Sequence, residues 1–331
     1  MALVTLSSGK SFEAANTLSI LDAAAQNHIS LPYSCKTGRC STCKCKVASG
    51  KTRPLHPETG LTEEEKGEGW ILSCVRAVEA NVVLEVDDLV SIDLPEHKTW
   101  PCRISEIKLL APDVVRVLLR LPPTADFRFI PGQYVDVIGS NGIRRSYSLA
   151  NASFADKQLE LHIRAVKGGA MSDYWFNRAK PNDLLRLNGP LGTFFLREQG
   201  GLDLFFLATG TGIAPVKAML ESMIYISPAQ MPKSLTVLWG GRKPEDLYFD
   251  VSQIPVSNIY IPVLSRPVEG WEGARGYVQD VLLNIKPDLT NAAVYACGSD
   301  DMIQSARTRF LEAGLPAKHF YSDAFVSSGT N

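Results

Sequence analysis

The tightest constraint on the fold of this chain is a set of four cysteines, three of which lie close together in the sequence. They are Cys35, Cys40, Cys43 and Cys74. Their C-x4-C-x2-C…C spacing is one in which thiolates hold a [2Fe–2S] cluster, with two thiolates on each iron. Gly38 lets the loop backbone pass close to the inorganic sulfides, and loop N–H groups can then point at sulfur. We therefore predict that these four side chains are the cluster ligands.

A structural zinc site is the alternative interpretation, because zinc also accepts four thiolates. Zinc knuckles are usually paired C-x2-C units, and the longer gap between Cys35 and Cys40 fits them poorly. Cys45 and Cys102 are expected to be buried small hydrophobic residues rather than ligands. The odd total of seven cysteines and their clustering argue against a disulfide framework.

The composition excludes several classes of function. The 331 residues leave room for two or three domains, and the net charge of −1 provides no basic field for nucleic acid or anionic lipid. No apolar run approaches the ~20 residues that span a bilayer, and the N-terminus lacks the features of a signal peptide. We expect a cytoplasmic protein with no nucleic-acid partner and no membrane partner.

The chain divides into three segments by composition. Residues 1–92 combine short strands with a helix over 19–27, arranged around the cysteine loop. A linker at 95–101 leads into residues 98–198, where β-branched and aromatic runs separated by turn signals predict a small antiparallel barrel. In residues 201–331, short apolar runs alternate with helical patterns, which predicts a parallel sheet with ligands at the carboxyl ends of its strands.

The second segment contains a candidate flavin-binding strand at Arg144–Ser148. We expect a cation, an aromatic ring and a hydroxyl of this strand to share one face. Arg145 can bind a phosphate, Tyr147 can flank an isoalloxazine ring, and Ser148 can hydrogen-bond the flavin. The alternative is an ordinary barrel strand with a charged exposed face, because such short motifs often occur by chance.

A glycine-rich helix start follows in the same segment. Residues 167–172 read Lys-Gly-Gly-Ala-Met-Ser and come shortly after a strand that carries His162 and Arg164. Glycines before a helix present free backbone N–H groups to a pyrophosphate. This stretch therefore favours FAD over FMN.

The third segment contains a second glycine-rich turn, between a predicted strand and a predicted helix. Gly210 and Gly212 lie in it, and Pro215 occupies the first helical turn, where proline is tolerated. Such a turn suits the phosphates of a dinucleotide. Cys297 ends a later strand, where ligands bind in open sheets, although a buried strand-end thiol is the alternative.

The order of these motifs resembles the ferredoxin–NADP reductase superfamily, and the first segment resembles the plant-type ferredoxin domain attached to bacterial reductases. The resemblance implies a multidomain α+β and α/β fold with a β-grasp [2Fe–2S] domain, an antiparallel β-barrel FAD domain and a parallel-sheet nucleotide-binding domain. The implied FAD-binding residues are Arg145, Ser146, Tyr147, Ser148, His162, Arg164, Val166, Gly169, Met171 and Ser172. The implied nicotinamide-dinucleotide-binding residues are Gly210, Thr211, Gly212, Pro215, Cys297 and Gly298.

The same resemblance implies that three residues lie at the reacting rings. Ser148 is placed at the flavin, Cys297 beside the nicotinamide, and Phe325 over the flavin until the nicotinamide arrives. Simple packing of the C-terminus is the alternative for Phe325. We expect NADH as the electron donor, with NADPH as the alternative because Arg266 and Arg275 resemble positions that bind a 2′-phosphate.

A closer resemblance is to the reductases that serve CDP-sugar dehydrases. The residues that carry it are 120–125, 132–134, 144–152, 192–195 and 320–326. It implies that electrons pass from NADH through FAD and the cluster to a partner enzyme, a CDP-4-keto-6-deoxyhexose 3-dehydrase of 3,6-dideoxysugar biosynthesis. One alternative is the reductase component of a bacterial oxygenase, of the phenol hydroxylase or ring-hydroxylating dioxygenase type. The other is a zinc-bearing interaction module without redox turnover.

Overall fold

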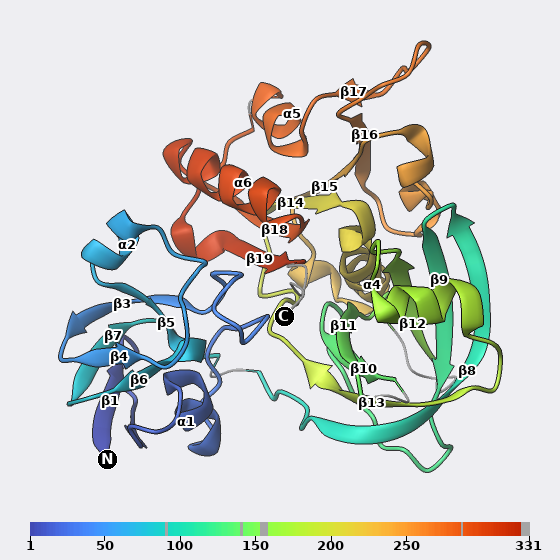
Figure 1. Cartoon of the computed structure of the whole chain (residues 1–331). Helices are drawn as coiled ribbons and strands as arrows, with labels where there is room; N and C mark the ends of the chain where they lie inside the picture. Colours follow the sequence, from blue (N-terminus) through green and yellow to red (C-terminus); the bar gives the residue numbers. More distant parts are fainter. Residues whose placement is uncertain (90–91, 140–141, 153–157, 286, 326–331) are drawn as a thin grey trace. The chain divides into compact units, whose positions relative to one another are not determined.

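The computed structural model describes residues 1–89, 92–139, 142–152, 158–285 and 287–325. The chain forms two compact units, whose boundary falls between Leu94 and Pro95 (Figure 1). The first unit contains the four cysteines of the predicted cluster. The second contains both predicted nucleotide-binding regions.

The first unit is built on a mixed sheet. Its strands are β1 (Ala2–Leu6), β2 (Ser11–Ala14), β3 (Lys44–Ser49), β4 (Thr52–Pro54), β5 (Trp70–Leu72), β6 (Arg76–Val78) and β7 (Val82–Glu85). Five strands pair in the order β2-β1-β7-β3-β5, and β4 pairs with β6 separately. Strands β1 and β7 are parallel, and the other neighbours are antiparallel. The helices are α1 (Ile20–Gln26), α2 (Glu63–Gly67) and a 3₁₀ turn at Ser73–Val75.

Helix α1 confirms the helix predicted at 19–27. Ser19 caps it, because its Oγ accepts a hydrogen bond from the backbone N–H of Asp22 at 3.0 Å. Ile20 and Leu21 belong to the apolar face, which is buried in the core of this unit. Helix α1 thus forms a packed element that precedes the cysteine loop in the chain.

The second unit begins with an antiparallel barrel. Its strands are β8 (Lys98–Ala111), β9 (Val114–Arg120), β10 (Tyr134–Ile138), β11 (Arg144–Ser148), β12 (Gln158–Arg164) and β13 (Leu184–Leu191). They pair in the order β11-β10-β13-β8-β9-β12, and a bridge between Leu149 and Leu161 joins the two ends. Strand β8 starts inside the linker predicted at 95–101. Before Arg103 it pairs with β13 alone, so Pro101 lies where one side of the strand has no partner.

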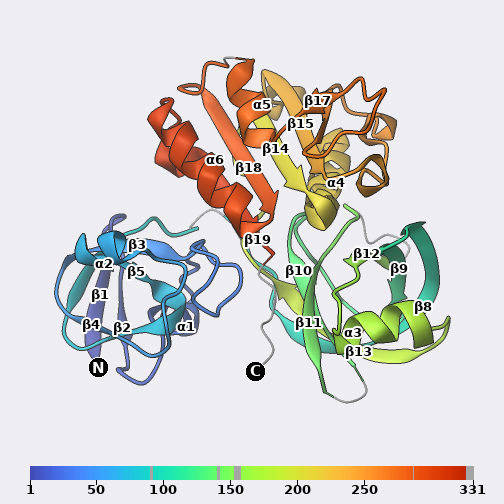
Figure 2. The same ribbon diagram turned by 45° about the horizontal axis from the view of Figure 1, so that its top comes forward.

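The second unit ends in a parallel sheet. Its strands are β14 (Asp203–Thr209), β15 (Ser234–Gly241), β16 (Ile259–Leu264), β17 (Ala274–Arg275), β18 (Ala292–Gly298) and β19 (Phe320–Ala324). Their order is β17-β16-β15-β14-β18-β19, and every pair is parallel. Helices α5 (Val278–Asn284) and α6 (Asp300–Glu312) lie on one face, and α4 (Ile213–Ser222) lies on the other (Figure 2).

The remaining helical segments of the second unit are short. Helix α3 (Ala170–Asp173) continues as a π-helical turn over Tyr174–Arg178. Single 3₁₀ turns lie at Gly210–Gly212, Met223–Tyr225, Pro228–Gln230, Pro244–Asp246, Val251–Gln253 and Ala317–His319. The mixed sheet, the barrel and the parallel sheet each have their own apolar core. No helix in the described part of the chain is long and apolar enough to cross a bilayer.

Candidate functional site

The four predicted cluster cysteines come together in the first unit. Cys35, Cys40 and Cys43 lie in the loop between α1 and β3, and Cys74 lies in the 3₁₀ turn before β6. Cys35 is half-buried and the other three are buried. One of the four thiols therefore lies near the surface, and the other three lie inside the unit.

The four thiols form two hydrogen-bonded pairs. The bond from the Cys40 thiol is the main reason that the pKa of Cys35 falls to about 4, and the Cys43 thiol lowers the pKa of Cys74 in the same way. The same bonds raise the pKa values of Cys40 and Cys43, and burial raises them further. A [2Fe–2S] cluster needs two thiolates on each iron, so a two-by-two arrangement matches its donor set.

Backbone N–H groups of the loop point at these sulfur atoms. The N–H of Thr37 donates to Cys35 Sγ at 3.3 Å, and the N–H of Cys35 donates to Cys40 Sγ at 3.4 Å. The N–H of Gly38 donates to Cys74. Such donors stabilise negative charge on thiolates and sulfides, as the sequence predicts.

The loop backbone is closely confined at Gly38. Its φ of 74° is in the left-handed region, and a Cβ there would lie 2.5 Å from the carbonyl oxygen of Pro57. Lys36 and Ser41 also have positive φ, at 54° and 58°. Positive φ at residues other than glycine is uncommon and occurs often at ligand-binding sites.

A single metal ion fits this arrangement less well than a two-iron cluster does. Among the residues that the structure describes, no three Cys, His, Asp or Glu side chains are close enough together to hold one ion. A mononuclear zinc needs four ligands at about 2.3 Å from one point. Cys45 and Cys102 are both buried, and burial raises the pKa of each thiol to about 12, which confirms that they are core residues.

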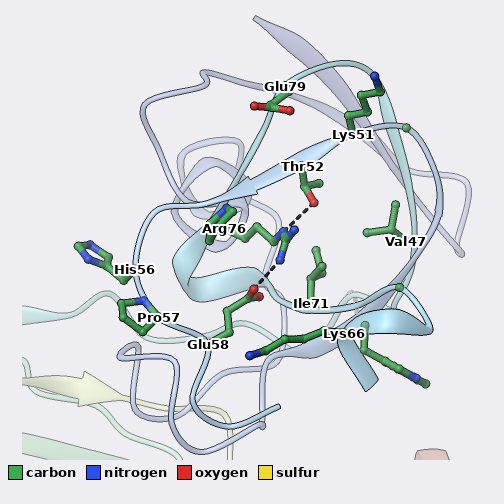
Figure 3. A pocket seen from close by; sticks show the side chains of 14 residues that line it. Val47, Lys51, Thr52, His56, Pro57, Glu58, Lys66, Ile71, Arg76 and Glu79 are labelled. Carbon is green, nitrogen blue, oxygen red and sulfur yellow. Dashed lines mark hydrogen bonds and ion pairs between the residues drawn. The ribbon is translucent and has the colours of Figure 1, made fainter. Parts of the chain in front are cut away.

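A buried ion pair lies beside the Cys74 segment, and the reasoning from the sequence did not find it. The Glu58 carboxylate accepts the backbone N–H of Leu72 at 2.8 Å and pairs with the Arg76 guanidinium. Arg76 Nε donates to Thr52 Oγ1 at 2.8 Å, and Figure 3 shows Arg76 between these two partners. The three side chains line a cavity of about 680 Å³. Glu58 thus binds the chain on both sides of Cys74.

In the second unit, strand β11 places the predicted flavin residues on two faces. Arg145 lies opposite Val137 and Tyr147 opposite Val135, so these two share the face that carries the barrel core. The Ser148 side chain lies on the other face, because successive residues alternate. The expectation that the cation, the ring and the hydroxyl share one face is therefore wrong for the hydroxyl.

Tyr147 is held by the barrel core. Its hydroxyl accepts a hydrogen bond from Trp175 Nε1 at 3.0 Å, and the two rings meet edge to face at 6.2 Å. Burial raises the pKa of Tyr147 to about 12. On the opposite face, Ser146 Oγ donates to Asp136 at 2.6 Å, while Ser148 is buried.

The glycine-rich helix start forms a tight turn before α3. Gly169 is the N-cap, and its N–H donates to the Val166 carbonyl at 2.9 Å. Ser172 Oγ accepts the N–H of Val166 at 2.8 Å, and the Val166 side chain is exposed. Met171 is buried in the barrel core, so it can face a phosphate only through its backbone.

His162 and Arg164 extend from β12 toward the parallel-sheet half of the unit. His162 Nε2 lies 2.8 Å from Glu160 Oε1, and Nδ1 lies 3.2 Å from the Tyr248 hydroxyl. Because a carboxylate can only accept, Nε2 carries the hydrogen and Nδ1 accepts from Tyr248. Burial lowers the pKa of His162, which favours this neutral ring. Arg164 pairs with Asp246 at 3.0 Å.

The two predicted nicotinamide motifs lie side by side at the carboxyl ends of β14 and β18. A Cβ at Gly212 would overlap the Cys297 carbonyl group, and a Cβ at Gly298 would overlap Thr209 Oγ1. The N–H of Ser299 donates to Thr209 Oγ1 at 3.0 Å. Only glycines allow this close approach of the two turns.

The other predicted residues of this region are placed as follows. Gly210 has a φ of 54°, Thr211 is half-buried, and Pro215 is buried in the first turn of α4. Cys297 is fully buried, and its burial together with the charge of Asp323 raises its pKa well above the usual value. Arg266 and Arg275 are exposed.

Phe325 ends the described part of the second unit. Its N–H donates to the Gly298 carbonyl at 2.8 Å, and its side chain is 38% exposed. The ring therefore lies at the carboxyl edge of the sheet, near the predicted nicotinamide motifs. Val326, which is part of the resemblance, lies outside the described residues.

The sequence reasoning missed a charged network that joins the barrel to the parallel sheet. Lys217 on α4 pairs with Glu160 on β12 at 3.3 Å and with Glu221 at 2.7 Å. Two signals could have found it. Lys217 is the single charge in the run from Ile213 to Leu220, and charged or polar side chains alternate along β12 at Glu160, His162 and Arg164.

Three families of domain match this chain. Residues 4–79 match the 2Fe-2S iron-sulfur cluster binding domain, residues 101–196 the oxidoreductase FAD-binding domain, and residues 206–308 the oxidoreductase NAD-binding domain. These matches agree with the thiol pairs in the first unit and with the two glycine-rich turns in the second.

Whole-chain relatives share this organisation. The CDP-6-deoxy-L-threo-D-glycero-4-hexulose-3-dehydrase reductase of Yersinia pestis is 41% identical, with 97% of each chain covered. The ferredoxin–NAD(P)(+) reductase component of the naphthalene 1,2-dioxygenase/salicylate 5-hydroxylase systems of a Ralstonia species is 28% identical, with 94% of each covered. The crystal structure of the Amycolatopsis cytochrome P450 reductase GcoB is 27% identical, has a TM-score of 0.75, and matches 98% of this chain and 99% of its own.

Proposed function

The chain belongs to the family of iron–sulfur flavoprotein reductases that join these three domains, and we propose here which residues bind its cofactors and which partner it serves. Its cofactors are a [2Fe–2S] cluster, FAD and a nicotinamide dinucleotide. Electrons pass from NADH through FAD and the cluster to an electron-accepting partner enzyme. The domains we propose span residues 1–92, 98–198 and 201–331.

The first proposal concerns the ligands of the cluster. Cys35 and Cys40 would hold one iron, and Cys43 and Cys74 the other. The observation that carries this assignment is the two-by-two pairing of the thiols, with backbone N–H groups directed at sulfur. The bound cluster supplies one-electron chemistry at the end of the electron path.

Two cysteines that are neighbours in the sequence test this assignment. Cys43→Ala should abolish the brown absorption and the iron and sulfide content of the purified protein. Cys45→Ala should keep both, because Cys45 is a buried core residue. The opposite result, with the cluster lost in Cys45→Ala and kept in Cys43→Ala, would contradict the assignment.

The second proposal concerns FAD and NADH. FAD is bound by the residues that the sequence predicts, with Arg145 and the turn before α3 nearest its phosphates. NADH is bound over Gly210–Gly212 and Gly298, where the two glycine-rich turns approach each other. The residues proposed at the reacting rings are Ser148, Cys297 and Phe325. The position of Phe325 beside Gly298 supports this assignment.

Replacing Phe325 tests the proposed arrangement of the rings. If Phe325 covers the flavin, Phe325→Ala should change the flavin absorption and tighten NADP⁺ and NAD⁺ binding, because the competing ring is gone. Titration of the flavin spectrum with each nucleotide measures this. Unchanged spectra and affinities would assign Phe325 to packing alone.

The third proposal is the partner. We infer a CDP-4-keto-6-deoxyhexose 3-dehydrase, supported by the 41% identity over 97% of the chain to a reductase named for such a dehydrase. The alternative is an oxygenase component, supported by the dioxygenase-system reductase at 28% identity.

Reconstitution with each partner separates these candidates. The purified reductase and NADH are combined either with the dehydrase and its CDP-sugar or with an oxygenase component and its aromatic substrate. Deoxysugar formation at a rate well above that of hydroxylation supports the dehydrase. Hydroxylation alone would contradict it and support the alternative. NADH and NADPH are compared in the same assay by cytochrome c reduction.

A further inference from the structure

Helix α4 contains one buried charge that the proposed cofactor sites do not use. Lys217 lies within a helix whose other residues from Ile213 to Leu220 are apolar, and only 9% of it is exposed. Burying an ammonium group is costly unless it is paired and hydrogen-bonded. Its partners therefore show what the side chain is doing in the fold.

Those partners belong to the barrel as well as to α4. Lys217 Nζ donates to the carbonyl oxygen of Ala150 at 2.8 Å and pairs with Glu160 at 3.3 Å. Glu221, one turn further along α4, pairs with Lys217 at 2.7 Å and accepts the N–H of Ala152 at 3.2 Å. Helix α4 thus binds this segment at two backbone groups, the carbonyl oxygen of Ala150 and the N–H of Ala152.

The two segments that Lys217 connects are those that carry the proposed reacting groups. Ala150 lies two residues after Ser148, the proposed flavin contact at the end of β11. Helix α4 begins directly after Gly210–Gly212, the proposed nucleotide turn. A shift of α4 relative to Ala150 would therefore change the distance between the two sites.

A second chain of contacts joins the same two regions. The His162 ring meets the Tyr248 ring edge to face at 5.4 Å, and Tyr248 meets Trp239 in the same way at 5.1 Å. Trp239 Nε1 donates to the carbonyl oxygen of Gly210 at 3.0 Å. These contacts connect the nucleotide turn to β12, whereas Lys217 connects α4, which follows that turn, to the segment after β11.

We propose that Lys217 is a positioning residue for hydride transfer, which it serves by fixing α4 against the segment that follows Ser148. The inference rests on the proposed FAD and NADH sites. The reaction converts NADH, FAD and one proton from solvent into NAD⁺ and FADH₂, with the other hydrogen and both electrons transferred as one hydride. Such transfers require the reacting atoms within about 3.5 Å, and a displacement of about 1 Å can slow them by about 100-fold.

The test uses the full-length holoenzyme, loaded with FAD and cluster, and the variant Lys217→Met, which keeps much of the apolar stem. The matched control is Lys233→Met, because Lys233 also pairs with a carboxylate in this unit, that of Asp203 at 3.2 Å, but its side chain is 69% exposed. Anaerobic stopped-flow absorption follows flavin reduction over a range of NADH concentrations. The measurement is repeated with NADH deuterated at the transferred hydrogen.

We expect Lys217→Met to lower the limiting rate of flavin reduction by about tenfold or more, because the rings are no longer held at reacting distance. The apparent dissociation constant of NADH should change less than the rate, and the deuterium isotope effect should persist. Lys217→Arg should recover part of the rate, since it restores the positive charge. Lys233→Met should match the wild type.

A readout without NADH separates positioning from general stability. Hydrogen–deuterium exchange should become faster in residues 148–152 and in α4 of Lys217→Met, while the exchange of the first unit stays unchanged. A limiting rate equal to that of the wild type would overturn the proposal. So would a loss confined to NADH affinity, since it would make Lys217 a determinant of binding only.

Two further outcomes keep the result interpretable. If Lys217→Met does not bind FAD, Glu221→Gln serves as the test variant. It removes the carboxylate charge that pairs with Lys217 and keeps an oxygen that can accept the N–H of Ala152. It should slow flavin reduction in the same direction, and an unchanged rate would overturn the positioning role. A wild-type flavin that NADH does not reduce would contradict the proposed function itself, not this inference alone.

Discussion

The cluster loop and the junction between barrel and parallel sheet are held together in different ways. Within the segment from Cys35 to Cys43, hydrogen bonds connect near neighbours, such as the N–H of Cys35 and Cys40 Sγ, five residues apart. In the junction, the bonds connect distant residues. Lys217 and Ala150 are 67 residues apart, and His162 and Tyr248 are 86 residues apart. The loop depends on backbone geometry and the junction on side-chain charges.

This difference separates two ways of holding redox groups. Backbone N–H groups directed at sulfur need the correct φ and ψ at a few positions, and at Gly38 a Cβ would overlap the carbonyl oxygen of Pro57. The junction needs each buried charge to keep its partner, because a charge left alone in the interior is strongly destabilising. We therefore expect the loop to respond to changes of backbone space, and the junction to changes of charge and pH.

The largest expected effect is at Gly38. In Gly38→Ala the new methyl group would meet the Pro57 carbonyl oxygen at 2.5 Å, so the loop must move and the N–H to Cys74 is lost. We expect the purified protein to contain little iron and sulfide and to lack the cluster absorption. The flavin absorption should remain, since the second unit has its own core.

Gly9→Ala is the matched control for this change. Gly9 has a φ of 81°, close to that of Gly38, but a Cβ there meets nothing within 4 Å. Both variants carry the conformational cost of a left-handed alanine, about 1 kcal/mol, and only Gly38→Ala adds the overlap. Equal cluster content in the two variants would show that backbone space at Gly38 does not matter.

The local character of the loop explains why the sequence could predict that these cysteines lie close together. The spacing of Cys35, Cys40 and Cys43 places the three thiols on one short loop, and Gly38 marks the close approach of the backbone. The helix capped by Ser19 could be predicted for the same reason. Glu58 could not, because its partners Leu72 and Arg76 are brought to it by the pairing of strands.

The junction was harder to predict because its partners meet only in the folded unit. The glycine turns at Gly210 and Gly212 have a local motif, and they were found. The pairing of Lys217 with Glu160 depends on how α4 packs on the barrel. Alternation along β11 also places Ser148 on the face opposite Tyr147, which shows that a motif in one strand does not define one surface.

The next largest effect is expected at Glu58, a buried charge in the first unit, which also contains the cysteine loop. Glu58→Gln leaves Arg76 without its carboxylate, and breaking a buried pair costs about 3 kcal/mol or more. Denaturant unfolding followed by cluster absorption should show this loss. Glu63→Gln is the control, because Glu63 pairs with Lys66 but is 90% exposed. Equal stability of the two variants would contradict a stabilising role of the Glu58–Arg76 ion pair in the first unit.

The third prediction concerns pH and the junction. Burial alone would raise the pKa of Glu160, but the hydrogen bond from His162 and the charges of Lys217 and Arg116 outweigh it and lower the pKa to about 2. The unfolded chain, with a pKa near 4.5, takes up the proton first. Stability is therefore present above pH 4.5 and lost as the pH falls toward 2, by about 3 kcal/mol in total.

Glu160→Gln tests this dependence, because glutamine resembles the protonated acid. Its unfolding free energy should fall furthest below that of the wild type near pH 7, and the gap should narrow below pH 4.5. Glu106→Gln is the control, since Glu106 also pairs with Arg116 at 3.6 Å but is half exposed. A gap that stays constant with pH would contradict a lowered pKa at Glu160. His162, whose pKa is also lowered, adds a loss that begins as the pH falls below 6.5.

The smallest expected effect is at Tyr248, where one hydroxyl is removed from the junction. In Tyr248→Phe the packing against Trp239 remains, but buried His162 Nδ1 loses the hydrogen bond that it accepts. An unsatisfied buried acceptor costs about 1–2 kcal/mol. Unfolding followed by flavin fluorescence should show this loss, whereas Tyr225→Phe, at a tyrosine that is exposed, should show none. Equal stability of the two tyrosine variants would contradict a hydrogen bond between Tyr248 and His162 Nδ1.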